Sequence, residues 1–522
     1  MKTFCKGPIQ RGTSSGFVLL LFMLLALGAI GVLLVTRLST SAAQVARNES
    51  TDESLRTAGE ALVAYAAGRN FSSGTVKPGS LPCPDLNDDG VAENSCGNAS
   101  GSDLATQPNR IGRLPWKTLG LPDLRDASGE RLWYVVSSQY KSSAVALPLL
   151  NPTTGLGTIT LRNDAGTIIH DGTSSNAYLG DAGGAVALVI APGDVLTRQG
   201  SMVRQDRSCN GGTCSPAGDS AGTCMSSPPS LTAKCNPINY LDIALGEDNA
   251  NFIDVNGNAA VRAGNGNGFI QGPVTVSGTL TVNDRIVAIT QDRIMAAVQQ
   301  RIAGETLGCL KLYASANRGR YPWPAPVCRQ PPLSPPAVPD PLAWSDHDSV
   351  TFGRIPDLDF DTTEGYLMGN SWGSGECNLN LTWWSDWKMH VFYAVADLYK
   401  PAATGNGGPS TSCTSSSCLQ VQDKDGNITA TGKQVAVIVA GRPLNTTTPA
   451  QVRGGNNDGY ASNYLEISNK ALEGLISAPL PSRPICDSLP PPPPACSTLS
   501  NCNKVTSSSR QSGFNDVVVF YP

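Results

Sequence analysis

Histidine and charge are both scarce in this chain. It has three histidines in 522 residues, and charged residues make up 15% of it. No two cysteines have the Cys-x2-Cys spacing of common zinc sites, and the histidines share no metal-binding spacing, so the sequence argues against zinc. It has no basic patch that would bind nucleic acid. The glycines at 264, 266 and 268 do not open a helix, which argues against a nucleotide-binding loop.

Glycine and proline are plentiful instead. There are 54 glycines and 38 prolines, and Ser, Thr and Asn are also abundant. This composition predicts more strand and loop than helix. The length exceeds what one hydrophobic core usually supports, so we expect two or three domains.

The cysteines favour an oxidising compartment. Fourteen of the fifteen follow Cys5, and an even number fits the outer side of a membrane. Short disulfide loops would stabilise irregular segments that bury little apolar surface. Most of the fourteen have a neighbour in the sequence: Cys83 and Cys96, Cys209 and Cys214, Cys224 and Cys235, Cys309 and Cys328, and Cys413 and Cys418, with Cys377, Cys486, Cys496 and Cys502 left over.

One long apolar run predicts a membrane helix. The residues from Phe17 to Val35 include no charge and no hydrogen-bonding side chain. A helix of about 20 apolar residues matches a hydrocarbon core about 30 Å thick. We therefore expect a transmembrane helix over residues 17–36.

The flanks of this run predict its orientation. Lys2, Lys6 and Arg11 precede it without any acidic residue, which favours a cytoplasmic N-terminus and an exported chain. The run is longer than the apolar part of most signal peptides. Cleavage at Ser41-Ala42-Ala43 by an ordinary signal peptidase is the alternative.

The residues around Gly16 carry a family resemblance. The stretch Arg11-Gly12-Thr13-Ser14-Ser15-Gly16 followed by Phe17-Val18-Leu19-Leu20-Leu21 resembles the leader of type IV pilins and of the pseudopilins of type II secretion. The resemblance implies a leader over residues 1–16. It also implies cleavage after Gly16 by a prepilin peptidase, which would expose Phe17 for methylation.

The fifth residue after this junction departs from the family. Most pilins have Glu there, and this chain has Leu21. In the family that Glu is thought to pair with the N-terminal ammonium of a neighbouring subunit, in a lipid environment that strengthens the contact. A subunit without it resembles the Glu-lacking minor pseudopilin at the filament tip.

Residues 38–68 continue the helical pattern beyond the membrane segment. Leu55, Ala58, Leu62, Tyr65 and Ala66 fall on one stripe. We expect one helix of about 50 residues, half in lipid and half packed on a soluble domain. A signal anchor followed by an unrelated amphipathic helix is the alternative.

An acidic loop indicates a calcium site. Asp85, Asn87 and Asp89 place oxygen ligands at every second position, Gly90 permits a sharp turn, and Glu93 can close the shell. The spacing is not that of an EF-hand. A solvated Asx turn between two cysteines explains the same residues equally well.

The chain also repeats itself. A turn at Asp126-Ala127-Ser128-Gly129 leads into an aromatic strand, as in pseudopilin sheets, and the apolar run at 185–190 predicts a central strand. Six segments recur later in the same order, which indicates a diverged tandem duplication. The pairs are Leu81-Pro82-Cys83-Pro84 with Tyr321-Pro322-Trp323-Pro324, Gly112-Arg113-Leu114-Pro115 with Gly353-Arg354-Ile355-Pro356, Tyr134 and Tyr140 with Tyr393 and Tyr399, the runs 186–191 and 435–440, Asn239-Tyr240-Leu241 with Asn463-Tyr464-Leu465, and Asn283-Asp284 with Asn515-Asp516.

A second amphipathic helix is expected at 291–317, with Thr290 as its N-cap. It stands where the soluble half of the first helix stood. The predicted fold is therefore α+β and disulfide-rich. A long N-terminal membrane helix precedes two tandem pilin-like domains, 37–289 and 290–522, each a helix packed on an antiparallel sheet.

Two further patterns suggest other functions. Trp383 and Trp384 belong to a tryptophan cluster, which is either an aromatic core or a stacking surface for a ligand. Gly369-Asn370-Ser371-Trp372-Gly373, with Asp386 and His390 after it, has the order of a hydrolase, but its flanks make a poor strand and a poor helix, so we expect no enzyme.

The expected function is a minor or tip component of a type IV pilus or a type II secretion-like filament. The resemblance implies the bacterial inner membrane, with a periplasmic C-terminal part, and then the pilus or cell surface. The implied partners are other pilin subunits, the inner-membrane assembly machinery and the prepilin peptidase. A pilin-anchored adhesin or ligand-binding protein is the alternative.

Overall fold

The structure is a computed structural model, and it describes most of the chain in separate stretches. Of the side chains between residues 15 and 43, it describes only those of Met23 and Leu25. Besides isolated positions, the described stretches are 15–69, 77–94, 111–137, 139–141, 150–174, 180–199, 237–250, 267–325, 351–356, 382–401, 418–447, 450–453, 460–466, 504–507 and 514–522.

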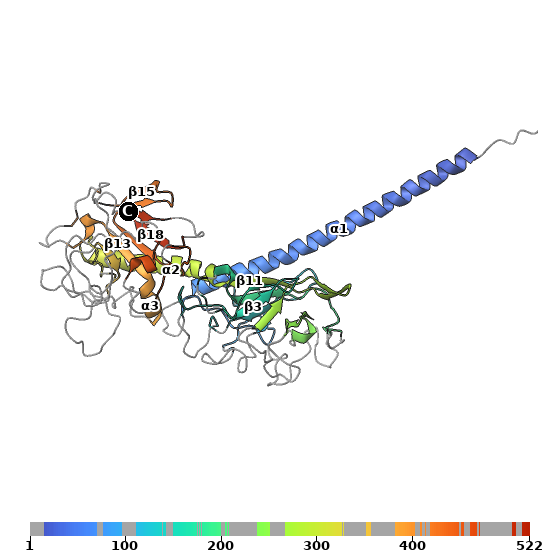
Figure 1. Ribbon diagram of the computed structural model, residues 1–522, viewed down its shortest axis with the longest axis horizontal. Coiled ribbons are helices and arrows are strands. Elements are labelled where there is room, and N and C mark those ends of the chain that lie inside the picture. The colour runs from blue at the N-terminus through green and yellow to red at the C-terminus, as the bar shows by residue number, and fades with distance from the viewer. Residues whose placement is uncertain are drawn as a thin grey trace, which may run out of the picture.

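The first element is a single long helix, as predicted. Helix α1 (Ser15–Gly68) has 54 residues and projects from the body of the molecule (Figure 1). Its exposed stretch 44–50 is followed by the buried residues Leu55, Ala58, Leu62 and Ala66, whose spacing of three and four places them on one face. Among the described side chains of α1, those that pack on the body therefore lie in its C-terminal part. Among the residues whose side chains the structure describes, which leave out nearly all of 15–43, no helix combines the length and hydropathy that a membrane span requires.

The first sheet has seven strands around one buried strand. β5 is buried at all seven positions and pairs antiparallel with β2 and β11. This confirms the central strand predicted from its unbroken apolar run. The strands are β1 (Ile111–Arg113), β2 (Trp133–Val136), β3 (Ile159–Arg162), β4 (Ile168–His170), β5 (Ala185–Ala191), β8 (Asn267–Ile270) and β11 (Arg285–Thr290).

The second half has a four-stranded antiparallel sheet and a three-stranded sheet beside it. The four strands follow the order β12-β13-β16-β18, and the three follow β15-β14-β17. Their bounds are β12 (Phe352–Arg354), β13 (Val391–Val395), β14 (Leu419–Gln422), β15 (Ile428–Lys433), β16 (Val435–Val439), β17 (Lys504–Thr506) and β18 (Val517–Tyr521). The smaller elements are α3 (Thr382–Trp387) and the strands β6 (Ile243–Ala244), β7 (Glu247–Asp248), β9 (Val274–Val276) and β10 (Thr279–Val282).

The two halves share strand order and register. β1-β2-β5-β11 in the first half has the order of β12-β13-β16-β18 in the second. Gly112 lies opposite Tyr134, and Gly353 lies opposite Tyr393. Beside them, β3 pairs antiparallel with β4 and parallel with β8, just as β14 does with β15 and β17. The segments that repeat in the sequence thus occupy equivalent places in the two halves.

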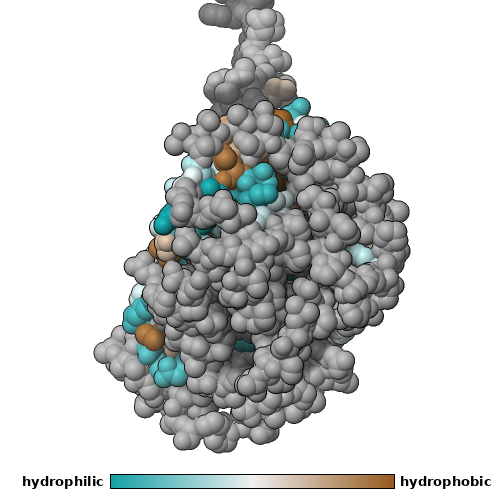
Figure 2. Space-filling model, turned by 90° about the vertical axis from the view of Figure 1, so that its left-hand side faces the viewer, coloured by the Kyte–Doolittle hydropathy of each residue, from teal (hydrophilic) through white to brown (hydrophobic). Residues whose placement is uncertain are grey.

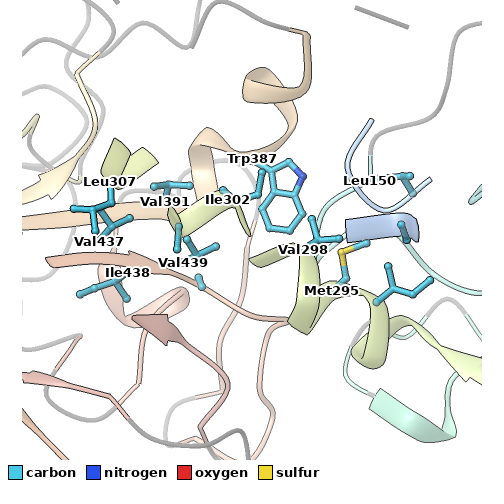
Figure 3. Packing of buried hydrophobic residues seen from close by; sticks show 14 of the residues in the cluster. Leu150, Met295, Val298, Ile302, Leu307, Trp387, Val391, Val437, Ile438 and Val439 are labelled. Carbon is cyan, nitrogen blue, oxygen red and sulfur yellow. The ribbon is translucent and has the colours of Figure 1, made fainter. Parts of the chain in front are cut away.

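Helix α2 (Gln291–Ala316) joins the halves without a linker. It begins at the residue after β11 and packs on α1, β16 and β18. Met295 and Val298 of α2 lie near Leu150 of the first half and Trp387 of the second (Figure 3). One buried hydrophobic cluster therefore runs through both halves. The expected boundary at 289/290 falls at the end of β11.

Thr290 is the N-cap residue of α2, as predicted, but its side chain does not form the expected capping hydrogen bond. Thr290 precedes the helix in an extended conformation but makes no side-chain cap bond. Its hydroxyl instead donates to Asp181 Oδ1 at 2.9 Å. The nearby carboxylate, a charged acceptor, forms the stronger bond and so competes successfully with the helix end.

Two of the local cysteine pairs form disulfides. Cys83 bonds to Cys96 and Cys413 bonds to Cys418, and Cys309 is also disulfide-bonded. The observed fold is thus α+β, with two long helices packed on mostly antiparallel sheets. That much of the predicted fold is confirmed.

Candidate functional site

The expected processing site lies at the start of α1. Gly16 and Phe17 belong to its first turn, but only their backbone is described. Cleavage between them stays a prediction.

The acidic loop turns its oxygens toward its own backbone. The buried Asp85 accepts N–H bonds from Asn87 at 3.2 Å, Asp89 at 3.3 Å and Gly90 at 2.6 Å. The side chains of Asn87 and Asp89 each accept an N–H from two residues further on, and Glu93 accepts that of Leu86. Burial raises the pKa of Asp85 to about 6. This is the geometry of an Asx turn.

Arginine supplies the positive charge at this loop. Asp88, also buried, pairs with Arg131 at 3.0 Å and lies 3.9 Å from Arg113. Among the described residues, no three acidic, histidine or cysteine side chains are arranged to hold a metal. The oxygens that the calcium hypothesis needs accept backbone N–H bonds, which the Asx-turn alternative explains without a metal. Calcium binding stays a prediction.

The tryptophan cluster contributes to the core. Trp384 is 5% exposed and Trp387 is fully buried, and Trp387 lies near Val298 of α2 (Figure 3). The side chain of Trp383 lies outside the described residues. Because the ring of Trp384 is covered, it offers no stacking surface, which favours the aromatic-core interpretation.

The hydrolase-like pattern does not come together among the described residues. Residues 369–373, with Ser371, lie outside them. Asp386 pairs with Lys77 at 2.7 Å, and His390 Nε2 lies 3.0 Å from the hydroxyl of Thr153. The two groups that would orient a serine are thus occupied with residues of the first half.

A buried arginine–tyrosine cluster is present in each half. In the first half, Arg113 lies between Trp133 and Tyr240, with its guanidinium carbon 4.3 and 4.1 Å from the two ring centres. Arg207 covers Tyr240 and donates to the carbonyls of Asn239, Tyr240 and Gly193. It therefore holds the loop around Tyr240 against the end of β5.

The second half contains the same arginine–tyrosine cluster. Arg354 lies 4.0 Å from the ring centre of Phe392 and 4.6 Å from that of Tyr464. Arg453 covers Tyr464 and donates to the carbonyls of Asn463, Tyr464 and Gly441. Each of these three carbonyl acceptors has its counterpart in the first half.

A carboxyl cluster lies beside each arginine–tyrosine cluster. In the first half, the backbone N–H of Asp242 donates to Asp284 Oδ2 at 2.8 Å, and that of Asn283 donates to Asp242 Oδ2 at 2.8 Å. Gln205 donates to Asp242, and Asn249 donates to Asp284. Four chain segments thus meet at two acids.

The carboxyl cluster of the second half replaces one Asp with Glu. Glu466 N–H donates to Asp516 Oδ2 at 3.1 Å, and Asn515 N–H donates to Glu466 Oε2 at 3.1 Å. Gln451 and Asn469 hold the two acids as Gln205 and Asn249 do. The longer Glu side chain keeps these bonds and accepts one more, from the N–H of Asp516 to Glu466 Oε2 at 3.2 Å.

Burial shifts the pKa values in these clusters. It raises the pKa of Asp284 and of Asp516 well above the usual value, and the neighbouring acid raises each further. Burial also raises the pKa of Asp242 and of Glu466. Each pair of acids can therefore hold a proton, and all four acids are buried.

The first half inserts a loop into the second beside Arg453. Arg453 Nη1 donates to Thr153 Oγ1 at 3.0 Å, which leaves the threonine hydroxyl free to donate to His390 Nε2. Asn151 donates to the carbonyl of Asp386, and Tyr178 donates to that of Gln451. Burial, with Arg453 and Arg354 nearby, lowers the pKa of His390 well below its usual value. This part of the contact between the two halves is thus polar and buried, and we call the whole contact between the halves the joint.

The sequence reasoning found half of each cluster. It singled out Arg113 and Tyr240 with their counterparts, and Asp284 with Asp516. It missed Gln205 and Arg207, Gln451 and Arg453, and the acids that follow the tyrosines. A Gln-x-Arg pattern in both halves, and an acid two residues after each tyrosine, were the available signals.

Comparison with known proteins identifies no relative. No family model, no curated protein and no solved structure matches the chain.

Proposed function

We propose that the chain is a membrane-anchored, Glu-lacking pilin-like protein, and that it serves as a minor or tip component of a type IV pilus or type II secretion-like filament. Residues 17–36 would form the anchor, and the two halves would form two pilin-like domains outside the membrane. The observation that carries this proposal is that α1 has two parts: a C-terminal part that packs on the sheets and an N-terminal part that projects from the body.

That division matches what a filament subunit requires. The C-terminal part of α1 buries Leu55, Ala58, Leu62 and Ala66 against β5 and β11. The N-terminal part extends beyond the body (Figure 1), and its sequence is apolar from Phe17 to Val35. A helix built this way can lie in lipid and later pack among other such helices while the sheets stay outside.

Leu21 supports a minor or tip position. It stands where most members of the family have the Glu that contacts the next subunit. A chain without that contact is expected to occupy the filament end. The adhesin alternative lacks comparable support, because Trp384 is buried. The coloured residues of the end shown in Figure 2 also carry only small, scattered hydrophobic groups.

The decisive experiment is the mature N-terminus of the protein from its own cells, read by mass spectrometry. The proposal expects Phe17, with an added methyl group on its amine. A chain that begins at Met1 or Gln44 would be a plain anchored or secreted protein instead, and the filament proposal would fail.

Copy number separates the tip role from a structural one. Quantitative mass spectrometry of sheared filaments should find this chain far below the major subunit in amount. Equal amounts would make it a major subunit and would remove the significance given to Leu21.

A further inference from the structure

Each half buries two acids in one hydrogen-bonded cluster. Asp242 and Asp284 are inaccessible to solvent, and Glu466 and Asp516 are 2% and 4% exposed. In both halves the bonding is reciprocal, because each acid accepts an N–H from the partner residue itself or from the residue next to it. Two full negative charges this close in a buried site repel each other strongly.

The surrounding charges do not cancel two carboxylates. Arg198 and Arg207 face the first pair, but Arg198 also pairs with Asp248 at 2.7 Å, and Arg207 lies 3.6 Å from Glu130. Arg453 is the cation that faces the second pair. The remaining groups at the two clusters are neutral amides: Gln205, Asn249 and Asn283 in the first half, and Gln451, Asn469 and Asn515 in the second.

One oxygen in each cluster is suited to carry a hydrogen. Among the described residues, Oδ1 of Asp284 and Oδ1 of Asp516 are buried and accept no hydrogen bond, whereas Oδ2 of each accepts two. A charged carboxylate oxygen that is buried without a donor is costly, and protonation there removes the second buried charge of the pair. The same orphan atom recurs in both halves.

We propose that each half retains one proton in its carboxyl cluster at neutral pH, and that losing this proton loosens the joint between the halves. The positions of Asp284 and Asp516 support the link between this proton and the joint. Asp284 directly precedes β11, which continues into α2, and Asp516 directly precedes β18, on which α2 packs. Ionisation at either cluster thus acts on a strand that borders the shared helix.

The proton itself can be detected by infrared spectroscopy of the full chain in detergent. A protonated-carboxyl band should persist at neutral pH, where exposed acids are ionised. Asp516→Asn and Asp284→Asn should each remove about half of it, and the double variant should remove it all. Asp425→Asn, a change on the exposed β14–β15 turn, should leave it intact.

The pH dependence of unfolding tests whether losing the proton destabilises the folded chain. A folded pKa raised above the unfolded value of about 4 means that unfolding releases the proton. The unfolding constant should therefore rise about tenfold per pH unit for each retained proton, from about pH 4 up to the folded pKa. Asp516→Asn imitates the neutral acid and should lower that slope by one proton, while Asp425→Asn should not change it.

Two results would overturn the proposal. One is the absence of the infrared band from the wild-type chain at neutral pH, including a band that appears only after chelation, since a cation would then occupy the clusters. The other is a pH slope unchanged in both Asn variants. If a variant does not fold, the wild-type band and the other variant still decide.

Discussion

The two halves of the molecule have the same buried clusters but different neighbours around them. In the first half, Arg207 lies beside Glu130 at 3.6 Å, and the turn at Asp126 packs on Thr51 of α1. In the second half, Arg453 binds Thr153 from the first half. The clusters, which both halves share, attach loops to each sheet. The residues around the clusters differ between the halves and determine which other segments each half contacts.

The element before the second strand shows the same divergence. The first half uses the Asp126–Gly129 turn, and Asp126 also accepts the N–H of Gly193 at 2.9 Å. The second half has α3 there, with Trp387 buried at the joint. The comparison teaches that strand order and clusters define the repeat, whereas the surrounding loops adapted to different contacts.

The largest effect is expected from the central arginines. Arg354→Ala and Arg113→Ala should each destabilise their own half by about 3 kcal/mol or more. Each loses two desolvated ring contacts and a charge-assisted hydrogen bond. Urea unfolding gives the total, and hydrogen exchange in β16 or β5 assigns the half. The half-exposed Arg125→Ala should change stability by less than about 0.5 kcal/mol. Losses below about 1 kcal/mol would mean that the clusters do not stabilise the halves.

A smaller effect should come from the paired glycines. A Cβ at Gly353 would lie 1.9 Å from the carbonyl oxygen of Ala325, and one at Gly112 would lie 2.6 Å from that of Asp85. Both carbonyls are held by backbone bonds, so we expect Gly353→Ala to cost about 3 kcal/mol and Gly112→Ala about 1–2. Gly304→Ala has open space in α2 and should stabilise by about 0.5–1 kcal/mol. Equal effects at 112 and 353 would show that the halves are more alike than these distances indicate.

A further difference between the halves is expected on acidification. Arg131 stands in the first half where His390 stands in the second, and only the histidine titrates in this range. His390 has a lowered pKa, so its contribution is present above the unfolded pKa of about 6.5 and is lost below it, about 2 kcal/mol by pH 5. Hydrogen exchange should therefore rise in β13 and not in β2, and His390→Gln should abolish the rise. Equal acceleration in both strands would contradict this.

The sequence predicted the parts of the fold that local pattern controls. The apolar run of β5, the helical spacing of α1 and the six repeated segments were visible because each is short and continuous. Arg207 and Arg453 could not be found in this way. Arg207 precedes Tyr240 by 33 positions, whereas Arg453 precedes Tyr464 by only 11. No fixed spacing therefore marks the pair.

The parallel pairings of β8 and β17 were missed for a similar reason. They depend on contacts between distant segments and not on periodicity. The acidic loop has a pattern that serves a cation or an Asx turn equally, and only the direction of the Asp85 oxygens separates the two. Burial of Trp387 likewise depends on α2, which no local pattern places beside it.

The missing linker between β11 and α2 has a mechanical consequence. Gln291 follows Thr290 directly, and Arg301 of α2 donates to the carbonyl of Ala67 near the end of α1 at 2.7 Å. A pull along α1 thus reaches the second half through packed helices and strands, with no slack tether to absorb it. The two halves should therefore rotate together as one rigid unit. A molecule bound to the second half would then experience both the direction and the size of a force applied along α1.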